Sequence, residues 1–352
     1  MKIPRLSIIL AAGLILCACS KDDNGGSSKK PSETSFALGA DISWTTMLES
    51  KGYKFYTQAG VQTECTALMK QCGMNSIRLR VWVNPSDRFS SKEDVLAMAL
   101  RAKANGMRLM IDFHYSDWWA DPGQQVIPAA WADYDLTGLK KAVGNHTREV
   151  LTLLKDNNID VEWVQVGNEV ADGMLYHKGR DGSGKAIDVV DYGGNITKNP
   201  RGYIALHNAG YDAVKEVYPD AKVIVHVDNG HDLGHVKWVL EAHKTYGGKY
   251  DIIGLSLYPG QDWQTPLQNC LANISELSSM YGRKVMICET GMDYWYDNNA
   301  YDMLTAMISG ARKISSCTGV FYWEPEAPQE EGYKMGAFKD GKPTHAMDAF
   351  AH

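Results

Sequence analysis

Val164-Gln165-Val166-Gly167-Asn168-Glu169 is the stretch from which the fold of this 352-residue chain can be assigned. A short run rich in valine ends in glycine, and an amide and a carboxylate follow at once. β-Branched residues favour strands, whereas glycine followed by polar residues marks the point where a strand gives way to a loop. Val285-Met286-Ile287-Cys288-Glu289-Thr290 has a similar design further along the chain. Both segments are therefore interpreted as buried strands that carry a glutamate at their carboxyl end.

Short apolar runs of this kind alternate with longer amphipathic segments about eight times from residue 36 onward. Such alternation is typical of repeated βα units with a parallel sheet. The predicted strands are residues 36–42, 75–81, 108–113, 162–167, 222–227, 252–257, 284–288 and 319–323. Predicted helices between them include residues 92–104, 139–155, 203–217 and 301–313, where apolar residues recur at three- and four-residue spacing.

Eight strands in sequence predict an α/β fold, a (β/α)8 TIM barrel in a single domain of about 250 residues or more. A doubly wound open sheet is the competing architecture, and the absence of a glycine-rich phosphate turn after the first strand disfavours it. Active sites of barrels lie at the carboxyl ends of the strands. The residues at these ends are unusually polar and aromatic: Asp41, Trp82, residues 114–119, Asn168, Glu169, Asp228, Asn229, Tyr258, Pro259, Glu289, Trp323 and Glu324.

The N-terminus has the pattern of an export signal. Lys2 and Arg5 precede an apolar run that is too short to span a bilayer comfortably, so residues 1–18 are predicted to be a signal peptide. The run ends Leu16-Cys17-Ala18-Cys19, which resembles a bacterial lipobox with Cys19 as the lipidated residue. Cys17 is the weaker candidate because Leu16 would then occupy the position of a small residue.

Residues 19–34 are polar and rich in Gly and Ser, which predicts a flexible tether ahead of a barrel domain at residues 35–352. The acidic pair Asp22-Asp23 resembles signals that send lipoproteins to the outer surface of some Gram-negative bacteria. We therefore expect an exported protein, lipid-anchored through Cys19 at the outer membrane or cell surface of a Gram-negative bacterium.

Charge and cysteine content exclude several classes of protein. A net charge of -6 offers no broad basic surface, so no nucleic acid partner is expected and the substrate should be neutral or merely polar. The cysteines after the signal region form an odd, scattered set without a CxxC pair, which argues against a disulfide framework or a zinc knuckle. Cys65 and Cys72 are interpreted as small hydrophobic residues of one helix. We expect a monomer.

Two long loops, at residues 115–136 and 171–199, are predicted at the active-site face. Long loops without obvious structure are usually functional or disordered. The second loop combines glycines with acidic residues and could wrap a structural Ca2+ ion, although its spacing does not match an EF-hand. No metal is expected among the catalytic residues, and no cofactor is required.

The two strand-end glutamates have the residue types that a retaining glycosidase needs. Such an enzyme uses one carboxylic acid to protonate the leaving oxygen and one carboxylate, about 5 to 5.5 Å away, to attack the anomeric carbon. A single glutamate at a strand end more often just caps the strand toward solvent. Asn168 immediately before Glu169, together with the three βα units that separate Glu169 from Glu289, makes the pair a stronger signal.

This arrangement resembles the clan of retaining (β/α)8 glycosidases, and within it the chain resembles glycoside hydrolase family 53, the endo-β-1,4-galactanases. The block from Asp112 to Pro122 carries the most family-specific likeness. The other matching segments are Gly39–Ser43, Asn75–Trp82, Gln165–Glu169, Ser256–Pro259, Glu289–Gly291 and Gly319–Pro325, so the likeness spans nearly the whole chain after the tether. Residues 173–199 do not align with the pattern.

The resemblance implies that Glu169 is the acid/base, Glu289 the nucleophile and β-1,4-galactan, the side chain of pectin known as type I arabinogalactan, the substrate. Asn168 would hold the 2-hydroxyl of the sugar. An arginine should keep Glu289 ionised, and Arg80 is preferred over Arg78 because it lies nearer the strand end. The remaining expected substrate-binding residues are Asp41, His114, Asp117, Trp118, Trp119, His226, Tyr258 and Trp323, with Trp131, Trp263 and Trp295 as further platforms for sugars.

Two other functions stay open. A clan relative that acts on β-mannan, xylan or β-glucan would share the catalytic residues, because specificity lies in the loops. A surface lipoprotein that binds glycans without cutting them would keep the barrel, but the presence of both glutamates argues against it.

Overall fold

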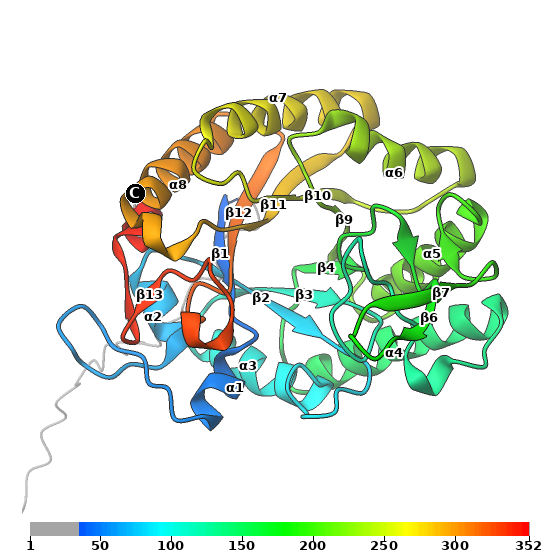
Figure 1. The fold of residues 1–352 in the computed structure, drawn as a ribbon, viewed down its shortest axis with the longest axis horizontal. Coiled ribbons are helices and arrows are strands. Elements are labelled where there is room, and N and C mark those ends of the chain that lie inside the picture. Colours follow the sequence, from blue (N-terminus) through cyan, green and yellow to red (C-terminus); the bar gives the residue numbers. More distant parts are fainter. Residues whose placement is uncertain (1–34, 352) are drawn as a thin grey trace, which may run out of the picture. The chain divides into compact units, whose positions relative to one another are not determined.

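The computed structural model describes residues 35–351. Eight parallel strands close into a barrel in the order β1-β12-β11-β10-β9-β4-β3-β2 (Figure 1). This confirms the predicted (β/α)8 fold. The barrel strands are β1 (Ala37–Asp41), β2 (Ser76–Val81), β3 (Arg108–Phe113), β4 (Trp163–Val166), β9 (Lys222–Val227), β10 (Ile252–Leu257), β11 (Lys284–Thr290) and β12 (Cys317–Trp323).

The observed strands lie within two residues of the predicted ones at every end. β11 runs on to Thr290 because it stays paired with β10 through an irregularity in the register between Leu255 and Ser256, after which Ser256 faces Glu289. β12 begins at Cys317, where Val285 of β11 already pairs with it. Glu289 is therefore held inside the hydrogen-bonded sheet rather than in the loop that follows.

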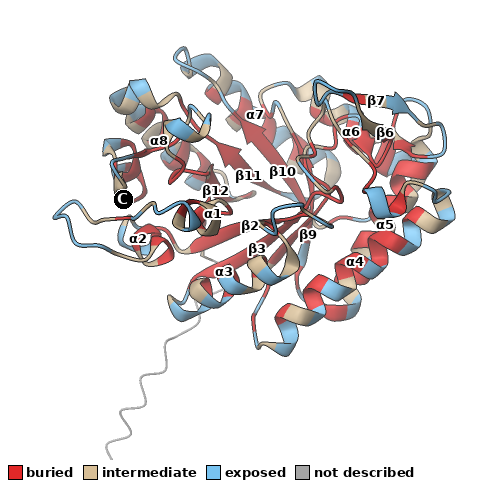
Figure 2. Cartoon of the chain, turned by 60° about the horizontal axis from the view of Figure 1, so that its bottom comes forward, coloured by how far each residue is buried: buried red, intermediate tan, exposed pale blue. Residues whose placement is uncertain are grey.

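Helices surround the barrel and turn their apolar sides toward it, so that buried residues face the strands and exposed residues face outward (Figure 2). They are α1 (Thr45–Ser50), α2 (Cys65–Gln71), α3 (Lys92–Ala104), α4 (Leu136–Asp156), α5 (Pro200–Val217), α6 (Leu233–Tyr246), α7 (Gln264–Tyr281) and α8 (Asp297–Arg312). α4 and α5 each begin three residues before the predicted start. Asp135 and Asn199 cap these ends by accepting hydrogen bonds from backbone N–H groups in the first turn.

The core has two layers. The larger one lies between the strands and the helices, and the smaller one fills the barrel interior with Ala37, Met110, Trp163, Ile224, Ile252, Met286, Cys288 and Phe321. Gly39 of β1 makes room for this interior packing, since a Cβ atom there would lie 2.4 Å from the ring of Phe321. The barrel interior toward the amino ends of the strands is therefore a packed apolar core, and the polar side chains of the interior gather at the carboxyl ends.

The loop after β4 contains more structure than its composition predicts. Two short antiparallel pairs occupy it: β5 (Gly173–Met174) with β8 (Gly194–Asn195), and β6 (His177–Arg180) with β7 (Ala186–Val189). Asp181 forms the turn between β6 and β7 by accepting hydrogen bonds from the backbone N–H groups of Ser183 and Lys185. A two-stranded hairpin of four residues per strand is too short to show a clear period of two.

The remaining elements are short. They are the 3-10 helices η1 (Ala129–Trp131), η2 (Tyr294–Tyr296), η3 (Gln329–Glu331) and η4 (His345–Ala351), and the pair β13 (Phe338–Lys339) and β14 (Lys342–Pro343). Within residues 35–351, no helix is long and apolar enough to cross a membrane. The five cysteines of this range are free, and all except Cys72 are buried. The predicted signal peptide 1–18, the lipidation site Cys19 and the tether 19–34 lie outside the described residues.

Candidate active site

A buried ion network occupies the carboxyl end of the barrel, centred on Arg78 of β2. Its guanidinium donates to Asp41 Oδ2 at 2.7 Å, to Asp112 Oδ2 at 2.9 Å and to Glu289 Oε1 at 2.7 Å. Arg78, Asp41 and Asp112 are fully buried, and Glu289 is only 5% exposed. Because water cannot screen these charges, the four side chains hold one another in a fixed geometry.

The expectation that Arg80 accompanies the nucleophile is wrong. Arg80 donates instead to Glu324 Oε1 at 2.9 Å, and its guanidinium lies over the ring of Trp119 at 4.1 Å. Both arginines project to the same side of β2, but the long side chain of Arg78 reaches up from the deeper position to Glu289. Nearness to the strand end was therefore the wrong criterion for choosing between them.

Asp41 is also placed differently from the expectation. It is fully buried, its Oδ2 is bound by Arg78, and its Oδ1 accepts hydrogen bonds from the backbone N–H and the hydroxyl of Ser43. Both carboxylate oxygens are therefore engaged within the protein. Asp41 orients Arg78 instead of presenting a surface to substrate.

Glu289 lies in β11, and both of its carboxylate oxygens are bound by side chains from other parts of the barrel rim. Arg78 binds Oε1, and the hydroxyl of Tyr258 donates to Oε2 at 2.9 Å. Burial raises the pKa of Glu289 to about 7, while the charge of Arg78 and the hydrogen bond from Tyr258 act in the opposite direction. The carboxylate is thus buried but supplied with partners that favour its ionised form.

Glu169 follows β4 in a backbone conformation that few non-glycine residues adopt, with φ of 46°. Gly167, with φ of 86°, starts this turn, and a Cβ atom there would meet the side chain of Val170 at 2.7 Å. Burial and the negative charge of Glu289 raise the pKa of Glu169 well above its ordinary value. Glu169 is therefore the carboxyl group of the pair that more readily keeps its proton.

Left-handed backbone recurs at this end of the barrel. Tyr115, Glu169, Asn229 and Glu324 all have φ between 46° and 50°, and each follows a barrel strand within three residues. Such conformations cost about 1 kcal/mol or more for residues other than glycine. Strain of this kind collects where side chains must be aimed at a site, and it marks the same rim as the two glutamates.

Asn168 is locked by the loops around it. Its Oδ1 lies 3.1 Å from an Arg78 nitrogen and 2.9 Å from His226 Nδ1, and its Nδ2 donates to the carbonyl of Ala120 at 2.8 Å. Gln125 also donates to the backbone carbonyl of Asn168. Within the described residues the second N–H of this amide makes no hydrogen bond, so it can donate one to a ligand hydroxyl.

The two histidines of the rim are buried and serve the network. The backbone N–H of Ala120 donates to His114 Nδ1 at 3.0 Å, so the ring proton lies on Nε2 and is donated to Asp112 at 3.0 Å. His226 Nε2 lies 2.9 Å from Ser256 Oγ. Burial lowers the pKa of both rings, that of His226 to about 3, so both are neutral near pH 7.

Sequence reasoning missed Asp112, Gln165 and Ser256 as members of this network. Gln165 Oε1 accepts from Arg78 Nε at 2.6 Å. The signal was present in the alternation of the strands, because Asp112 and Gln165 are paired neighbours and both interrupt apolar runs. A polar residue in an otherwise apolar strand needs a buried partner, and each of these residues has one.

Aromatic rings form a cluster above the ion network. Trp323 lies 5.5 Å from Trp119 and 4.8 Å from Tyr333, measured between ring centroids, and Trp44 lies beside all three. Trp118 is 43% exposed and packs against Trp82 at 4.8 Å. Trp44, Trp82 and Tyr333 were not among the expected binding residues. Trp82 was recognised only as a residue at the end of a strand, and Trp44 and Tyr333 lie in loops whose paths the sequence does not reveal.

Other expected platforms divide into accessible and inaccessible rings. Trp295 is 74% exposed on η2, and Trp263 is half-buried, with its indole N–H donating to Asn299. Trp131 is buried and packs against His146, so it is not an open platform. Asp117 joins two loops by accepting hydrogen bonds from the backbone N–H groups of Asn84 and Ala129.

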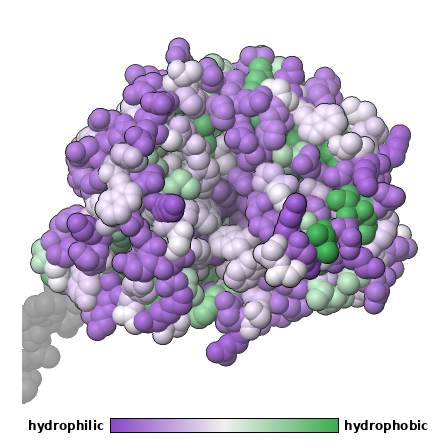
Figure 3. All heavy atoms as spheres, in the orientation of Figure 1, coloured by the Kyte–Doolittle hydropathy of each residue, from purple (hydrophilic) through white to green (hydrophobic). Residues whose placement is uncertain are grey.

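The space-filling view shows a hollow near the middle of the face seen in Figure 1 (Figure 3). Its surroundings are mainly hydrophilic or intermediate in character, as suits a polar substrate. Among residues 35–351, no group of three or more His, Cys, Asp or Glu side chains lies where it could hold a metal ion. The rim presents two carboxyl groups, Glu169 and Glu289, whose pKa values are both raised by burial, that of Glu169 well above its ordinary value.

Comparison with known proteins gives a consistent result. Residues 37–351 match the sequence profile of glycosyl hydrolase family 53. A probable arabinogalactan endo-β-1,4-galactanase A of Neosartorya fischeri is 32% identical over 311 residues, which cover 82% of this chain and 83% of that protein. An endo-β-1,4-galactanase of Bacillus subtilis is 28% identical over 370 residues, covering 91% of this chain and 81% of that protein.

Solved structures show the same barrel. A fungal β-1,4-galactanase superposes with a TM-score of 0.79 at 24% identity and covers 90% of this chain and 99% of its own. The family 53 catalytic domain of Ignisphaera aggregans superposes with a TM-score of 0.78 at 24% identity, covering 90% of this chain and 96% of its own. The sequence profile covers nearly all of the described residues, and the resemblance inferred from the strand-end motifs is confirmed. The chain belongs to glycosyl hydrolase family 53.

Proposed function

We propose that this glycoside hydrolase is a retaining endo-β-1,4-galactanase that cuts the galactan side chains of pectin, with Glu169 as acid/base and Glu289 as nucleophile. The observation that carries the assignment is the difference between the two carboxyl groups. Glu289 is bound by Arg78 and Tyr258, which favour its ionised form, whereas burial and the charge of Glu289 favour protonated Glu169.

In the first step, Glu169 gives its proton to the glycosidic oxygen, and a Glu289 oxygen forms a bond to the anomeric carbon as the bond to the leaving sugar breaks. The covalent ester removes the negative charge of Glu289. Since that charge is one of the causes that raise the pKa of Glu169, the pKa of Glu169 falls in the intermediate. Glu169 then accepts a proton from water, whose oxygen attacks the anomeric carbon and releases Glu289.

The surrounding residues support these steps by position. Asn168 donates one amide N–H to the carbonyl of Ala120, and its second N–H would hold the 2-hydroxyl of the reacting sugar, where hydrogen bonds strengthen in the transition state. Trp323, within the aromatic cluster, would form the floor under that sugar. No cofactor takes part, because two carboxyl groups and water balance the reaction.

Galactan is proposed as substrate because curated relatives of similar length carry galactanase names. Purified β-1,4-galactan, β-mannan, xylan and cellulose should be incubated in parallel, with viscosity and reducing ends followed over time. Galactan should be cut fastest, and its viscosity should fall before many reducing ends accumulate. Preference for another polymer, or release of galactose alone from the first minutes, would overturn the substrate or the endo mode. Absence of cleavage of all four would favour the glycan-binding alternative.

The retaining mechanism has a separate test. Proton NMR of an early digest should show the β-anomer of the new reducing end first, followed by slow mutarotation. Initial α-anomer would contradict a covalent intermediate on Glu289. A chelator should leave the initial rate unchanged, and a fall in melting temperature under the same treatment would indicate the structural Ca2+ considered for residues 171–199.

We further propose that the mature protein is a monomer, exported and anchored by a lipid on Cys19 at the outer membrane or surface of a Gram-negative cell. The support is the lipobox-like segment ending at Cys19 and the Gly- and Ser-rich stretch that follows it. Sedimentation of the barrel domain without residues 1–34 tests the oligomeric state.

A further inference from the structure

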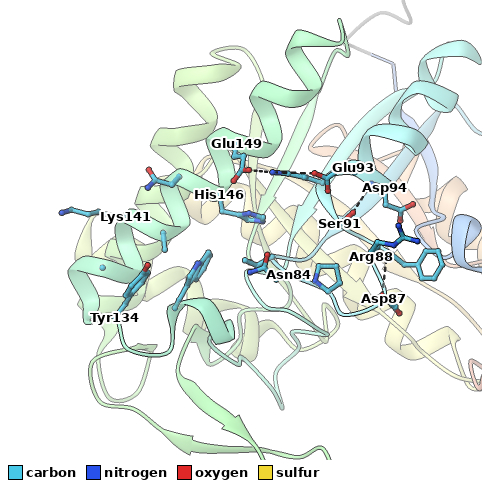
Figure 4. Close-up of a pocket in the computed structure, with 18 residues that line it drawn as sticks. Asn84, Asp87, Arg88, Ser91, Glu93, Asp94, Tyr134, Lys141, His146 and Glu149 are labelled. Atoms are coloured by element: carbon cyan, nitrogen blue, oxygen red, sulfur yellow. Dashed lines mark hydrogen bonds and ion pairs between the residues drawn. The ribbon is translucent and has the colours of Figure 1, made fainter.

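A groove of about 1190 Å3 lies outside the ion network, between α3 and α4 and the loops that precede them (Figure 4). Its lining comes from the loop after β2, which includes Asn84 and Phe89, from η1 and the residues after it, and from the facing sides of the two helices. A space of this size accommodates several sugar rings. Neither Glu169 nor Glu289 belongs to its lining.

Aromatic rings stand among polar groups in this groove. Tyr134, between η1 and α4, is 43% exposed, and Phe89 on the opposite loop is half-buried. Trp131 closes the space from the side of η1 and is itself buried. Flat rings that combine an apolar face with polar neighbours match the alternating CH groups and hydroxyls of a pyranose.

His146 provides a second, independent observation. His146 is only 7% exposed, and in Figure 4 its side chain projects from α4 toward the loop that carries Asn84. Its Nε2 has no hydrogen-bond partner among the described residues. A buried polar atom without a partner destabilises the protein by about 1–3 kcal/mol unless something else satisfies it. Burial lowers the pKa of His146 to about 4, so the ring is neutral near pH 7 and can pair with a hydroxyl.

The charges in the groove disfavour an anionic ligand. Three cationic side chains, Arg88, Lys92 and Lys141, stand against four acidic ones, Asp87, Glu93, Asp94 and Glu149. Lys92 is already paired with Glu149 and lies 3.8 Å from Glu93. With no cationic excess, a phosphate or a uronate chain would gain little, whereas a neutral polyhydroxylated chain would meet donors and acceptors of both kinds.

The groove is joined to the active-site rim through Asp117. The carboxylate accepts from the backbone N–H of Asn84 at 3.0 Å and from that of Ala129 at 2.8 Å, so it links two loops that each contribute residues to the groove lining. The next residue, Trp118, is exposed on the rim. A polysaccharide long enough to pass over Trp118 could therefore occupy both places.

We propose that this groove is a second, non-catalytic binding site for a neutral oligosaccharide chain, with Tyr134 as its stacking platform and His146 as a hydrogen-bonding group. The expected occupant is a stretch of the same polysaccharide that the rim hydrolyses, and only the choice of galactan rests on the proposed function. Holding the polymer at two places raises its local concentration at the catalytic residues.

The test measures binding in the Glu289→Ala background, where hydrolysis cannot interfere. Calorimetric titration with β-1,4-galactotetraose should find two classes of site, and adding Tyr134→Ala should leave one. Trp238→Ala is the matched control, because Trp238 is an aromatic residue of α6 that is 50% exposed and does not line the groove. The control should keep both classes. His146→Leu, a second groove variant, should weaken the same class as Tyr134→Ala.

Electrophoresis through gels that contain galactan, mannan or xylan separates this proposal from the proposed function. In the Glu289→Ala background, Tyr134→Ala should reduce several-fold the retardation by the polymer that the wild-type enzyme hydrolyses. In the otherwise wild-type enzyme, Tyr134→Ala should leave the cleavage of galactotetraose unchanged. If Tyr134→Ala and Trp238→Ala are retarded equally in every gel, the groove is not a glycan site, even if galactan is hydrolysed. Retardation that depends on Tyr134 in mannan or xylan alone would uphold the groove and overturn the choice of galactan.

Discussion

Arg78 donates to Glu289 Oε1 at 2.7 Å, and this contact is the only ion pair that Glu289 makes within the described residues. The same guanidinium nitrogen also binds Asp112 at 2.9 Å. Three buried carboxylates therefore depend on one cation for their charge balance. The ionisation of the proposed nucleophile is coupled to the integrity of the whole network.

Arg78→Lys should lower kcat by at least about 100-fold, because an ammonium group cannot reach three carboxylates with the geometry of a guanidinium. Arg78 acts against burial to hold the pKa of Glu289 down. A weaker contact raises that pKa, so the acid limb of the kcat/KM profile should move to higher pH. Arg108→Lys, at the opposite end of the barrel, should leave the profile in place. An unmoved limb in Arg78→Lys would mean that the cation does not set the ionisation of Glu289.

Arg80→Met should affect KM more than kcat. Arg80 lies over Trp119 and pairs with Glu324, whose pKa burial already raises well above its ordinary value, so Glu324 can take up a proton when the cation is lost. Loss of the cation–π contact should loosen the aromatic cluster and raise KM about 10-fold. Steady-state kinetics on galactan check this, and a loss confined to kcat would place Arg80 in the chemistry instead.

Glu169→Ala and Glu289→Ala should each reduce hydrolysis by several orders of magnitude while the fold survives. Azide should rescue Glu289→Ala and yield the inverted α-glycosyl azide, because the anion replaces the missing carboxylate on the opposite face of the sugar. With a substrate that has a good leaving group, azide should rescue Glu169→Ala with retention, giving the β-azide. NMR of the products decides, and exchanged stereochemistry would reverse the two roles.

His207→Leu should make the barrel less sensitive to acid. His207 is fully buried, neither ring nitrogen has a hydrogen-bond partner among the described residues, and burial lowers its pKa to about 3. The unfolded chain takes up a proton near pH 6.5 and the folded one does not, so His207 destabilises the fold as the pH falls from about 6.5 toward 3. At pH 4 the buried His207 lowers the free energy of unfolding by about 3 kcal/mol relative to pH 7.

Melting temperatures measured between pH 7 and pH 4 should therefore fall less steeply for His207→Leu than for the wild type. His345→Leu is the control, because the side chain of His345 is 44% exposed. Parallel curves for His207→Leu and the wild type would show that His207 acquires a partner in solution.

Labelled palmitate should mark the full-length protein expressed in a Gram-negative host and should not mark Cys19→Ala. The expectation follows from the lipobox-like segment, in which Ala18 supplies the small residue before Cys19. Cys17→Ala serves as control and should still be labelled. Equal labelling of the wild type and Cys19→Ala would exclude anchoring through Cys19.

The sequence was most informative where one local pattern determines the outcome. Alternation of strands and helices located all eight barrel strands, and the position of Glu169 and Glu289 after apolar runs placed both at one rim. The choice between Arg78 and Arg80 depended on depth and side-chain length, which a period of two cannot resolve. The sequence therefore favoured Arg80, whereas Arg78 binds Glu289.

Contacts between loop residues could not be predicted from the sequence, for a different reason. Trp44 follows β1 and Tyr333 follows the neighbouring strand β12, and their rings lie 6.1 Å apart beside Trp323. Trp131 looked like a platform because its loop is long, but it is buried against His146. Burial of a loop residue depends on the path of the whole loop, and composition does not encode that path.

β1 runs from the amino end of the barrel toward the catalytic rim. Ala37 opens β1 at the amino end of the barrel, whereas Asp41 and the two glutamates lie at the carboxyl end. The chain therefore enters the barrel at the pole opposite the catalytic rim. If Cys19 carries the proposed lipid, the catalytic rim lies at the end of the barrel away from the point where the anchored segment joins it, so a long polysaccharide could reach Glu169 and Glu289 without passing that segment.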